Sequence, residues 1–195
     1  MPKIILISGS PKTDGNTAQL MQECVKAIHE YGVETEVISF AGMNIQSCGA
    51  CGKCSETGEC DIQDGLNEII AKIRGAQGLI VGTPVYFGTA RGDVMAALQR
   101  IGYVSMRSNK FLSGMVGGPV AVARRGGQTS TLQEILMFFL INDMIVPGST
   151  YWNMVVGRLP GEVWKDHEGI ETIRHFAANV ATLVKKLNPP ARAAN

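Results

Sequence analysis

The chain has 195 residues, of which 45% are hydrophobic and 18% are charged, and its formal net charge is +1. This length and composition predict one folded domain over residues 1–195 and exclude a disordered chain. A nearly neutral chain lacks the basic field that attracts nucleic acid, and none of its apolar runs approaches the ~18–20 residues of a membrane span. The apolar run at residues 4–7 is also too short for a signal peptide, so we expect a cytoplasmic protein without nucleic-acid or membrane partners.

The beginning of the chain reads as a strand, a helix and a second strand. Residues 3–8 (KIILIS) form a short apolar run that is typical of a buried parallel strand. Residues 9–16 are rich in Gly, Ser, Pro and Asn and predict a loop. Apolar residues then recur at helical spacing until Gly32 ends the helix, and residues 33–40 alternate like a less buried strand.

A polar loop at residues 41–61 contains four of the five cysteines. A loop of this length inside a compact domain usually carries function. We therefore interpret residues 41–63, approximately, as a cysteine-rich insertion into the domain.

The rest of the chain continues the alternation of strands and helices. Asp64 can cap the first helix of this part, and Pro189-Pro190 stops the last one, leaving the final five residues loose. Five strands alternate with five helices in total, which predicts a parallel sheet covered by helices on both faces. The predicted helices are 65–74, 92–101, 128–141 and 169–187; the predicted strands are 78–82 and one each within 113–123 and 144–156; residues 83–89 and 124–127 are predicted loops.

The loop that opens the first helix has the composition of a phosphate site. A helix N-terminus offers free N–H groups and the positive end of the helix dipole. Ser10, Asn16 and Thr17 add side-chain donors, and Lys12 adds charge. The loop has neither the triphosphate motif nor the dinucleotide motif, so it suits a single terminal phosphate such as that of FMN. The other interpretation is a capped turn with no ligand.

Two further loops leave the same predicted sheet edge. In the loop at residues 83–89, Tyr86 and Phe87 offer flat faces to a heterocycle, although a lone aromatic residue more often caps a core. The third loop carries Arg124 and Arg125 before two glycines. A cation there would favour a reduced, anionic flavin, but both arginines could equally face solvent or a partner subunit.

The cysteine loop has the spacing C-x2-C-x2-C-x5-C, formed by Cys48, Cys51, Cys54 and Cys60. Structural zinc sites usually pair two cysteine knuckles across a longer span, whereas three cysteines at this short spacing are more typical of [4Fe–4S] ligation. Free thiols, a redox dithiol and zinc remain alternatives. Cys24 lies on the apolar face of the first helix and is expected to be a buried hydrophobic residue.

The motif Ser-x-Ser-Pro-x-x-x-Gly-Asn-Thr at residues 8–17, together with residues 83–88 (TPVYFG), resembles the NADPH-dependent FMN reductase branch of the flavodoxin-like superfamily. The cysteine motif resembles that of the iron-sulfur flavoproteins. The resemblance implies a flavodoxin-like three-layer α/β fold with a five-stranded parallel sheet in the order 2-1-3-4-5. It implies cluster ligation by the four loop cysteines. The residues expected to contact FMN are Ser8, Ser10, Lys12, Asn16, Thr17, Pro84, Val85, Tyr86, Phe87, Gly88, Thr89, Ala123, Arg124, Gly126 and Gly127.

The function expected from these residues is an FMN-dependent oxidoreductase whose [4Fe–4S] cluster exchanges single electrons with a carrier such as ferredoxin. The resemblance also implies a homodimer or homotetramer. One alternative is an NAD(P)H-dependent FMN or quinone reductase without a cluster, and another is a zinc-stabilised, non-catalytic binding module. The sequence contains no visible acid–base constellation, so no catalytic side chain is predicted, and the chemistry is expected to take place on the flavin.

Overall fold

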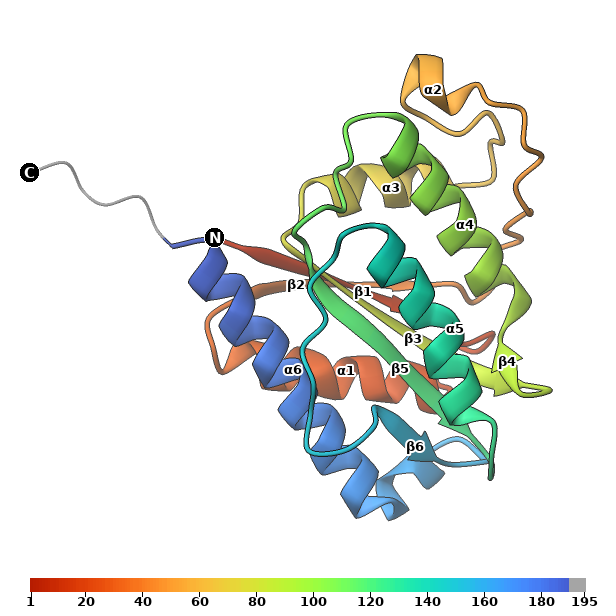
Figure 1. Ribbon diagram of the computed structural model, residues 1–195. Coiled ribbons are helices and arrows are strands. Elements are labelled where there is room, and N and C mark those ends of the chain that lie inside the picture. Colours follow the sequence, from red (N-terminus) through yellow and green to blue (C-terminus); the bar gives the residue numbers. More distant parts are fainter. Residues whose placement is uncertain (190–195) are drawn as a thin grey trace, which may run out of the picture.

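The structure is a computed structural model that describes residues 1–189. A parallel sheet with the order β2-β1-β3-β5-β6 forms its centre, as Figure 1 shows. This confirms the flavodoxin-like fold and the expected strand order, since the fourth and fifth predicted strands are β5 and β6. The expectation that the last five residues are loose concerns a segment outside the described residues. The parallel strands are β1 (Lys3–Ser8), β2 (Glu34–Ser39), β3 (Gly78–Tyr86), β5 (Val116–Ala123) and β6 (Met154–Val156).

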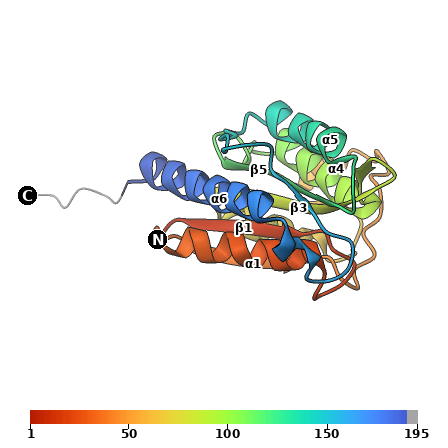
Figure 2. The ribbon, with the colours of Figure 1, turned by 90° about the horizontal axis from the view of Figure 1, so that it is seen from below.

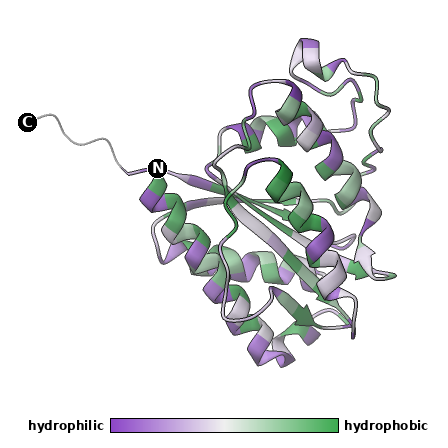
Figure 3. Cartoon of the chain, in the orientation of Figure 1, coloured by the Kyte–Doolittle hydropathy of each residue, from purple (hydrophilic) through white to green (hydrophobic). Residues whose placement is uncertain are grey.

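Helices cover both faces of the sheet (Figure 2). The alternation of side chains along β1 shows why: Ile4 and Leu6 belong to the apolar cluster with α1 and α6, whereas Ile5 and Ile7 belong to the cluster with α3, α4 and α5. Figure 3 shows the hydrophobic residues concentrated along the strands and the inner sides of the helices. The helices are α1 (Asn16–His29), α2 (Cys54–Thr57), α3 (Leu66–Arg74), α4 (Gly92–Arg107), α5 (Gln128–Ile141), the short 3-10 helix η1 (Glu162–Lys165) and α6 (His167–Leu187).

The segment predicted as a loop at residues 83–89 is instead mostly strand. β3 continues to Tyr86, and a short strand β4 (Thr89–Ala90) pairs with its end in antiparallel fashion. Phe87 and Gly88 connect the two strands with φ angles of 54° and 83°, the left-handed conformation of a tight hairpin turn. Helix α5 holds this hairpin, because the Ser130 hydroxyl donates to the Gly88 carbonyl over 2.6 Å.

Two further expectations about helices need correction. Helix α4 extends six residues beyond the predicted end at Ile101, to Arg107. The N-cap residue of α3 is Gly65, with a φ of 87°, and Asp64 lies one residue before it; its carboxylate nevertheless accepts a hydrogen bond from Leu66 N, at the start of the helix, over 3.4 Å. The same carboxylate also pairs with the buried Arg100, a partner that is distant in sequence. Among residues 1–189, no helix combines the length and apolarity needed to cross a membrane.

A buried carboxylate joins the two helices on the α1 side of the sheet. Glu23 of α1 is 4% exposed and accepts hydrogen bonds from Arg174 Nε over 2.7 Å and from Lys26 Nζ over 3.0 Å. Burial by itself raises the pKa of Glu23, but the hydrogen bonds from Lys26 and Arg174 outweigh it and hold this pKa below its usual value.

This arrangement predicts an acid-sensitive contribution to stability. Because the pKa of Glu23 is lower in the folded than in the unfolded chain, its contribution is present at neutral pH and is lost as the pH falls below about 4.3, the ordinary value for Glu. We expect Glu23→Gln to lower the free energy of unfolding by about 1–2 kcal/mol at pH 7, since both cationic partners are partly exposed. Urea unfolding of the wild type and of Glu23→Gln, at pH 7 and near pH 4, measures the difference in their free energies of unfolding. The difference between the variant and the wild type should shrink at the lower pH, and an unchanged difference would contradict the assignment.

Candidate functional site

The N-terminus of α1 is open toward a cavity. Its N-cap residue, Gly15, has an extended conformation, and no side chain caps the helix. The N–H groups of the first turn therefore lack intrahelical acceptors and are available to an anion. A Cβ at Gly15 would come within 2.4 Å of Ser10 Oγ, so only glycine allows this close approach.

The cavity has a volume of about 270 Å³ and is formed by loops at the carboxyl ends of β1, β3, β5 and β6. This is where ligands bind in open parallel sheets. Nine of the fifteen residues expected to contact FMN line it: Ser10, Lys12, Asn16, Thr17, Pro84, Val85, Tyr86, Ala123 and Arg124. The other six, Ser8, Phe87, Gly88, Thr89, Gly126 and Gly127, are not among its lining residues.

The residues outside the lining occupy distinct places around the cavity. Ser8 is buried at the end of β1, and its hydroxyl has no hydrogen-bond partner among the described residues. Phe87 projects fully into solvent from the tip of the hairpin. Gly127 is the N-cap of α5 and packs so closely on the hairpin that a Cβ there would lie 2.9 Å from Gly88 Cα. Their contacts with a flavin ring stay predictions.

A fourth loop, which the sequence analysis did not include, completes the cavity wall. It follows β6 and contributes Gly157, Arg158 and Pro160. Asn16 Oδ1 accepts a hydrogen bond from Gly161 N over 2.8 Å, which ties this loop to the start of α1. This loop could have been predicted from the sequence, because it directly follows the last strand and all parallel strands of a sheet end at the same edge.

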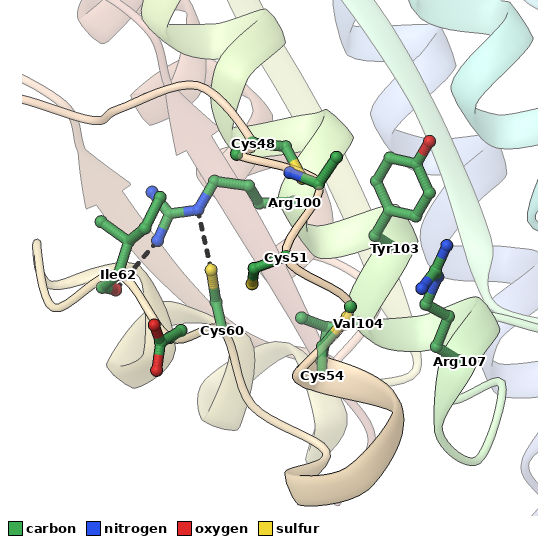
Figure 4. A pocket seen from close by; sticks show the side chains of 13 residues that line it. Cys48, Cys51, Cys54, Cys60, Ile62, Arg100, Tyr103, Val104 and Arg107 are labelled. Carbon is green, nitrogen blue, oxygen red and sulfur yellow. Dashed lines mark hydrogen bonds between the residues drawn. The ribbon is translucent and has the colours of Figure 1, made fainter.

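The four loop cysteines line a second cavity, of about 140 Å³, beside α4 (Figure 4). Between Cys48 and Cys60 the backbone is left-handed at Ala50, Gly52 and Gly58, with φ angles of 53°, 79° and 73°. Glycine adopts this conformation without strain, so Gly52 and Gly58 help the loop to curl around the cavity. The α4 side chains on the wall are those of Arg100, Tyr103, Val104 and Arg107.

The ligand arrangements of zinc and of a [4Fe–4S] cluster can be compared with the cysteine cavity. Among residues 1–189, no three His, Cys, Asp or Glu side chains are grouped closely enough to hold a single metal ion. Structural zinc requires four ligands converging on one centre. In a [4Fe–4S] cluster, each thiolate binds a different iron at the corner of a larger core. Thiolates are ligands of both groups, and the four thiols that line this one cavity are the donor set that such a cluster uses.

Arg100 connects the cysteine loop to α4. Its side chain is 1% exposed, and its guanidinium donates to Cys60 Sγ over 3.2 Å, as Figure 4 shows. The remaining donors reach the carbonyls of Gln46 and Ile62, at 3.1 and 3.0 Å, and both carboxylate oxygens of Asp64. Burial raises the pKa of Asp64, but the hydrogen bonds from Arg100 and from Gln46 N outweigh it, so the pKa lies below its ordinary value.

Cys24 is separate from this group, as the sequence analysis expected. It is fully buried on α1, and burial, reinforced by the negative charge of Glu23, raises the pKa of its thiol to about 12. A thiol that remains protonated at neutral pH is a poor nucleophile and a poor metal ligand.

Helix α4 starts beside the loop that follows β1 and lines the cysteine cavity with its later residues, whereas the two cavities have no lining residue in common. At its N-terminal end, Arg91 Nη1 donates to the Gly9 carbonyl in the phosphate loop over 3.1 Å. Val94 packs against the same glycine. Arg100, which contacts the cysteine loop, lies six residues after Val94, or about 9 Å further along the helix at 1.5 Å per residue.

Comparisons with known proteins agree with this arrangement. Residues 2–157 match the sequence profile of the family described as NADPH-dependent FMN reductase. An iron-sulfur flavoprotein of Methanocaldococcus jannaschii is 42% identical over 190 residues, covering 94% of this chain and 97% of the relative. An iron-sulfur flavoprotein of Archaeoglobus fulgidus is 31% identical over 195 residues, covering 94% and 98%. Among solved structures, a flavodoxin, WrbA-like protein from Agrobacterium tumefaciens superposes with a TM-score of 0.68 at 15% identity, covering 95% of this chain and 99% of the other.

Proposed function

This chain belongs to the NADPH-dependent FMN reductase family, with iron-sulfur flavoproteins as its relatives, and from that premise we propose that it is an electron carrier that holds both FMN and a [4Fe–4S] cluster. It is an FMN-dependent oxidoreductase. When bound, FMN supplies two-electron chemistry and the cluster supplies one-electron transfer.

In this proposal, the FMN phosphate lies at the open N-terminus of α1. The free N–H groups of the first turn and the hydroxyls of Ser10 and Thr17 donate to it. Arg124 and Arg158, which line the same cavity, add positive charge. Pro84, Val85 and Tyr86 form an apolar wall for the ring, which excludes water from its face.

The cluster proposal rests on one observation above all: four thiols contributed by thirteen residues line a single cavity. Cys48, Cys51, Cys54 and Cys60 would each hold one iron. Val104 and Ile62 give the cavity apolar walls, which limit the access of water to the metal.

The proposed partners follow from the resemblance to the iron-sulfur flavoproteins, which implies an oligomer. We infer that the cluster and the flavin meet across a subunit interface, in a homodimer or a homotetramer. A ferredoxin or NAD(P)H would be the external partner.

Anaerobic purification followed by quantification of flavin, iron and sulfide tests the proposal. We expect about one FMN, four irons and four sulfides per chain. Flavin without iron would overturn the cluster and favour an NAD(P)H-dependent FMN or quinone reductase. Zinc without flavin would overturn both cofactors and favour a zinc-stabilised binding module.

A further inference from the structure

Arg100 is buried beside a thiol that the proposed function assigns as a cluster ligand. An arginine with 1% exposure is unusual, because a buried charge is costly unless every donor is paired. All of its pairing is local to the cysteine loop: Asp64 supplies the countercharge, and the other three acceptors are Cys60 Sγ and the carbonyls of Gln46 and Ile62.

The two carbonyl acceptors flank the segment from Cys48 to Cys60 on both sides. Gln46 precedes Cys48 by two residues, and Ile62 follows Cys60 by two residues. A single guanidinium on the rigid α4 therefore fixes both ends of the loop that presents the four thiols. Lysine cannot do this, because its ammonium is a point charge without the planar fork of five donors.

The bond from Arg100 Nε to Cys60 Sγ adds an electrostatic effect. A donor aimed at a sulfur ligand stabilises negative charge on that sulfur. The reduced cluster carries one more negative charge than the oxidised cluster, so the donor stabilises the reduced state more, and hydrogen bonds to sulfur are a recognised determinant of cluster potential. The nearby carboxylate of Asp64 offsets the net charge of Arg100 but leaves this directional bond in place.

We propose that Arg100 is a positioning residue that fixes Cys60 in the cysteine cavity and raises the reduction potential of a [4Fe–4S] cluster bound there. This inference rests on the proposed function. It assigns a role in electron transfer to a helix residue forty positions away from the thiol it contacts.

A redox titration of the anaerobically purified protein, with dithionite as the electron donor and the reduced cluster followed by electron paramagnetic resonance, tests the role. Arg100→Lys should keep the positive charge, the FMN and most of the iron. Its equilibrium constant for one-electron reduction should fall at least about tenfold, a shift of about 59 mV to more negative potential. Arg107→Lys is the matched control, since Arg107 lines the same cavity but its guanidinium lies 5.2 Å over the ring of Tyr103 and makes no hydrogen bond to a thiol of residues 1–189.

Arg100→Lys with the wild-type potential, or with a shift equal to that of Arg107→Lys, would overturn the inference. If circular dichroism shows that Arg100→Lys does not fold, the reduction potential of the cluster is measured in Asp64→Asn instead. That variant keeps Arg100 and removes its countercharge, so its potential should rise, and an unchanged or lower potential would refute the role. A wild-type protein without iron would overturn the proposed function itself, which separates the two failures.

Discussion

Cys54→Ser should lose nearly all of the bound iron, from about four atoms per chain to near zero, because a cubane cluster needs a thiolate at each corner. The Ser hydroxyl remains protonated at neutral pH and is a poor ligand for iron. Cys54 is fixed as the first residue of α2, and its carbonyl accepts a hydrogen bond from Gly58 N over 3.1 Å. The residues next to Cys54 in the chain are Lys53 and Ser55, so neither neighbour can supply a thiol in its place.

Iron and sulfide analysis, together with the visible absorption that bleaches with dithionite, measures this loss. FMN content should stay at the wild-type level, because the flavin cavity and the cysteine cavity have no lining residue in common. Cys24→Ala is the matched control: it also removes one thiol, but this thiol is fully buried on α1, so iron content should not change. Full iron in Cys54→Ser would refute the ligand assignment.

Thr17→Val should weaken FMN binding about 10- to 150-fold, as expected when a hydrogen bond to a charged group, worth about 1.5–3 kcal/mol, is lost. Thr17 is in the first turn of α1 and lines the flavin cavity. Thr17 is 2% exposed and borders the cavity beside the open helix N-terminus, so we expect its hydroxyl to donate to a phosphate bound there. Valine keeps the methyl group that faces Gly82, which limits the change to the hydroxyl.

Fluorescence titration of the flavin-free protein with FMN, under reducing and oxygen-free conditions, gives the Kd. Thr35→Val serves as the control, since Thr35 lies on β2 and its hydroxyl contacts His29, away from the cavity. Riboflavin, which lacks the phosphate, should bind both variants and the wild type equally weakly. A Kd for FMN that does not change in Thr17→Val would show that the phosphate lies elsewhere.

The features that the sequence predicted well are those carried by contiguous residues. The apolar run at residues 3–8 predicted the buried strand β1, and the Gly-Asn-Thr segment after it predicted the start of α1 with its free N–H groups. The four cysteines lie within thirteen residues, and this short spacing predicted that they share one site, as they do around one cavity. In each case the interaction is set by the local path of the chain.

The hairpin at residues 83–90 depended on the tertiary structure. Its strand pairing is stabilised by Ser130 and Glu134 of α5, which lie more than forty residues away. No local sequence motif predicts these contacts. The loop after β6 likewise joins the flavin cavity through Asn16, 145 positions earlier in the chain.

Asp64 and Arg100 show most clearly what sequence alone determined and what it could not. Nothing in the order of the residues pairs Asp64 with Arg100, and by itself Asp64 is a good helix cap. In the folded chain this carboxylate accepts a hydrogen bond from Leu66 N at the start of α3 and also pairs with the guanidinium of Arg100, which would otherwise be an unpaired buried charge. Most of the expected residues that line the two cavities could therefore be predicted from the sequence. The role of Arg100, which ties the cysteine loop to α4, depends on the fold, because its partners are distant in the sequence.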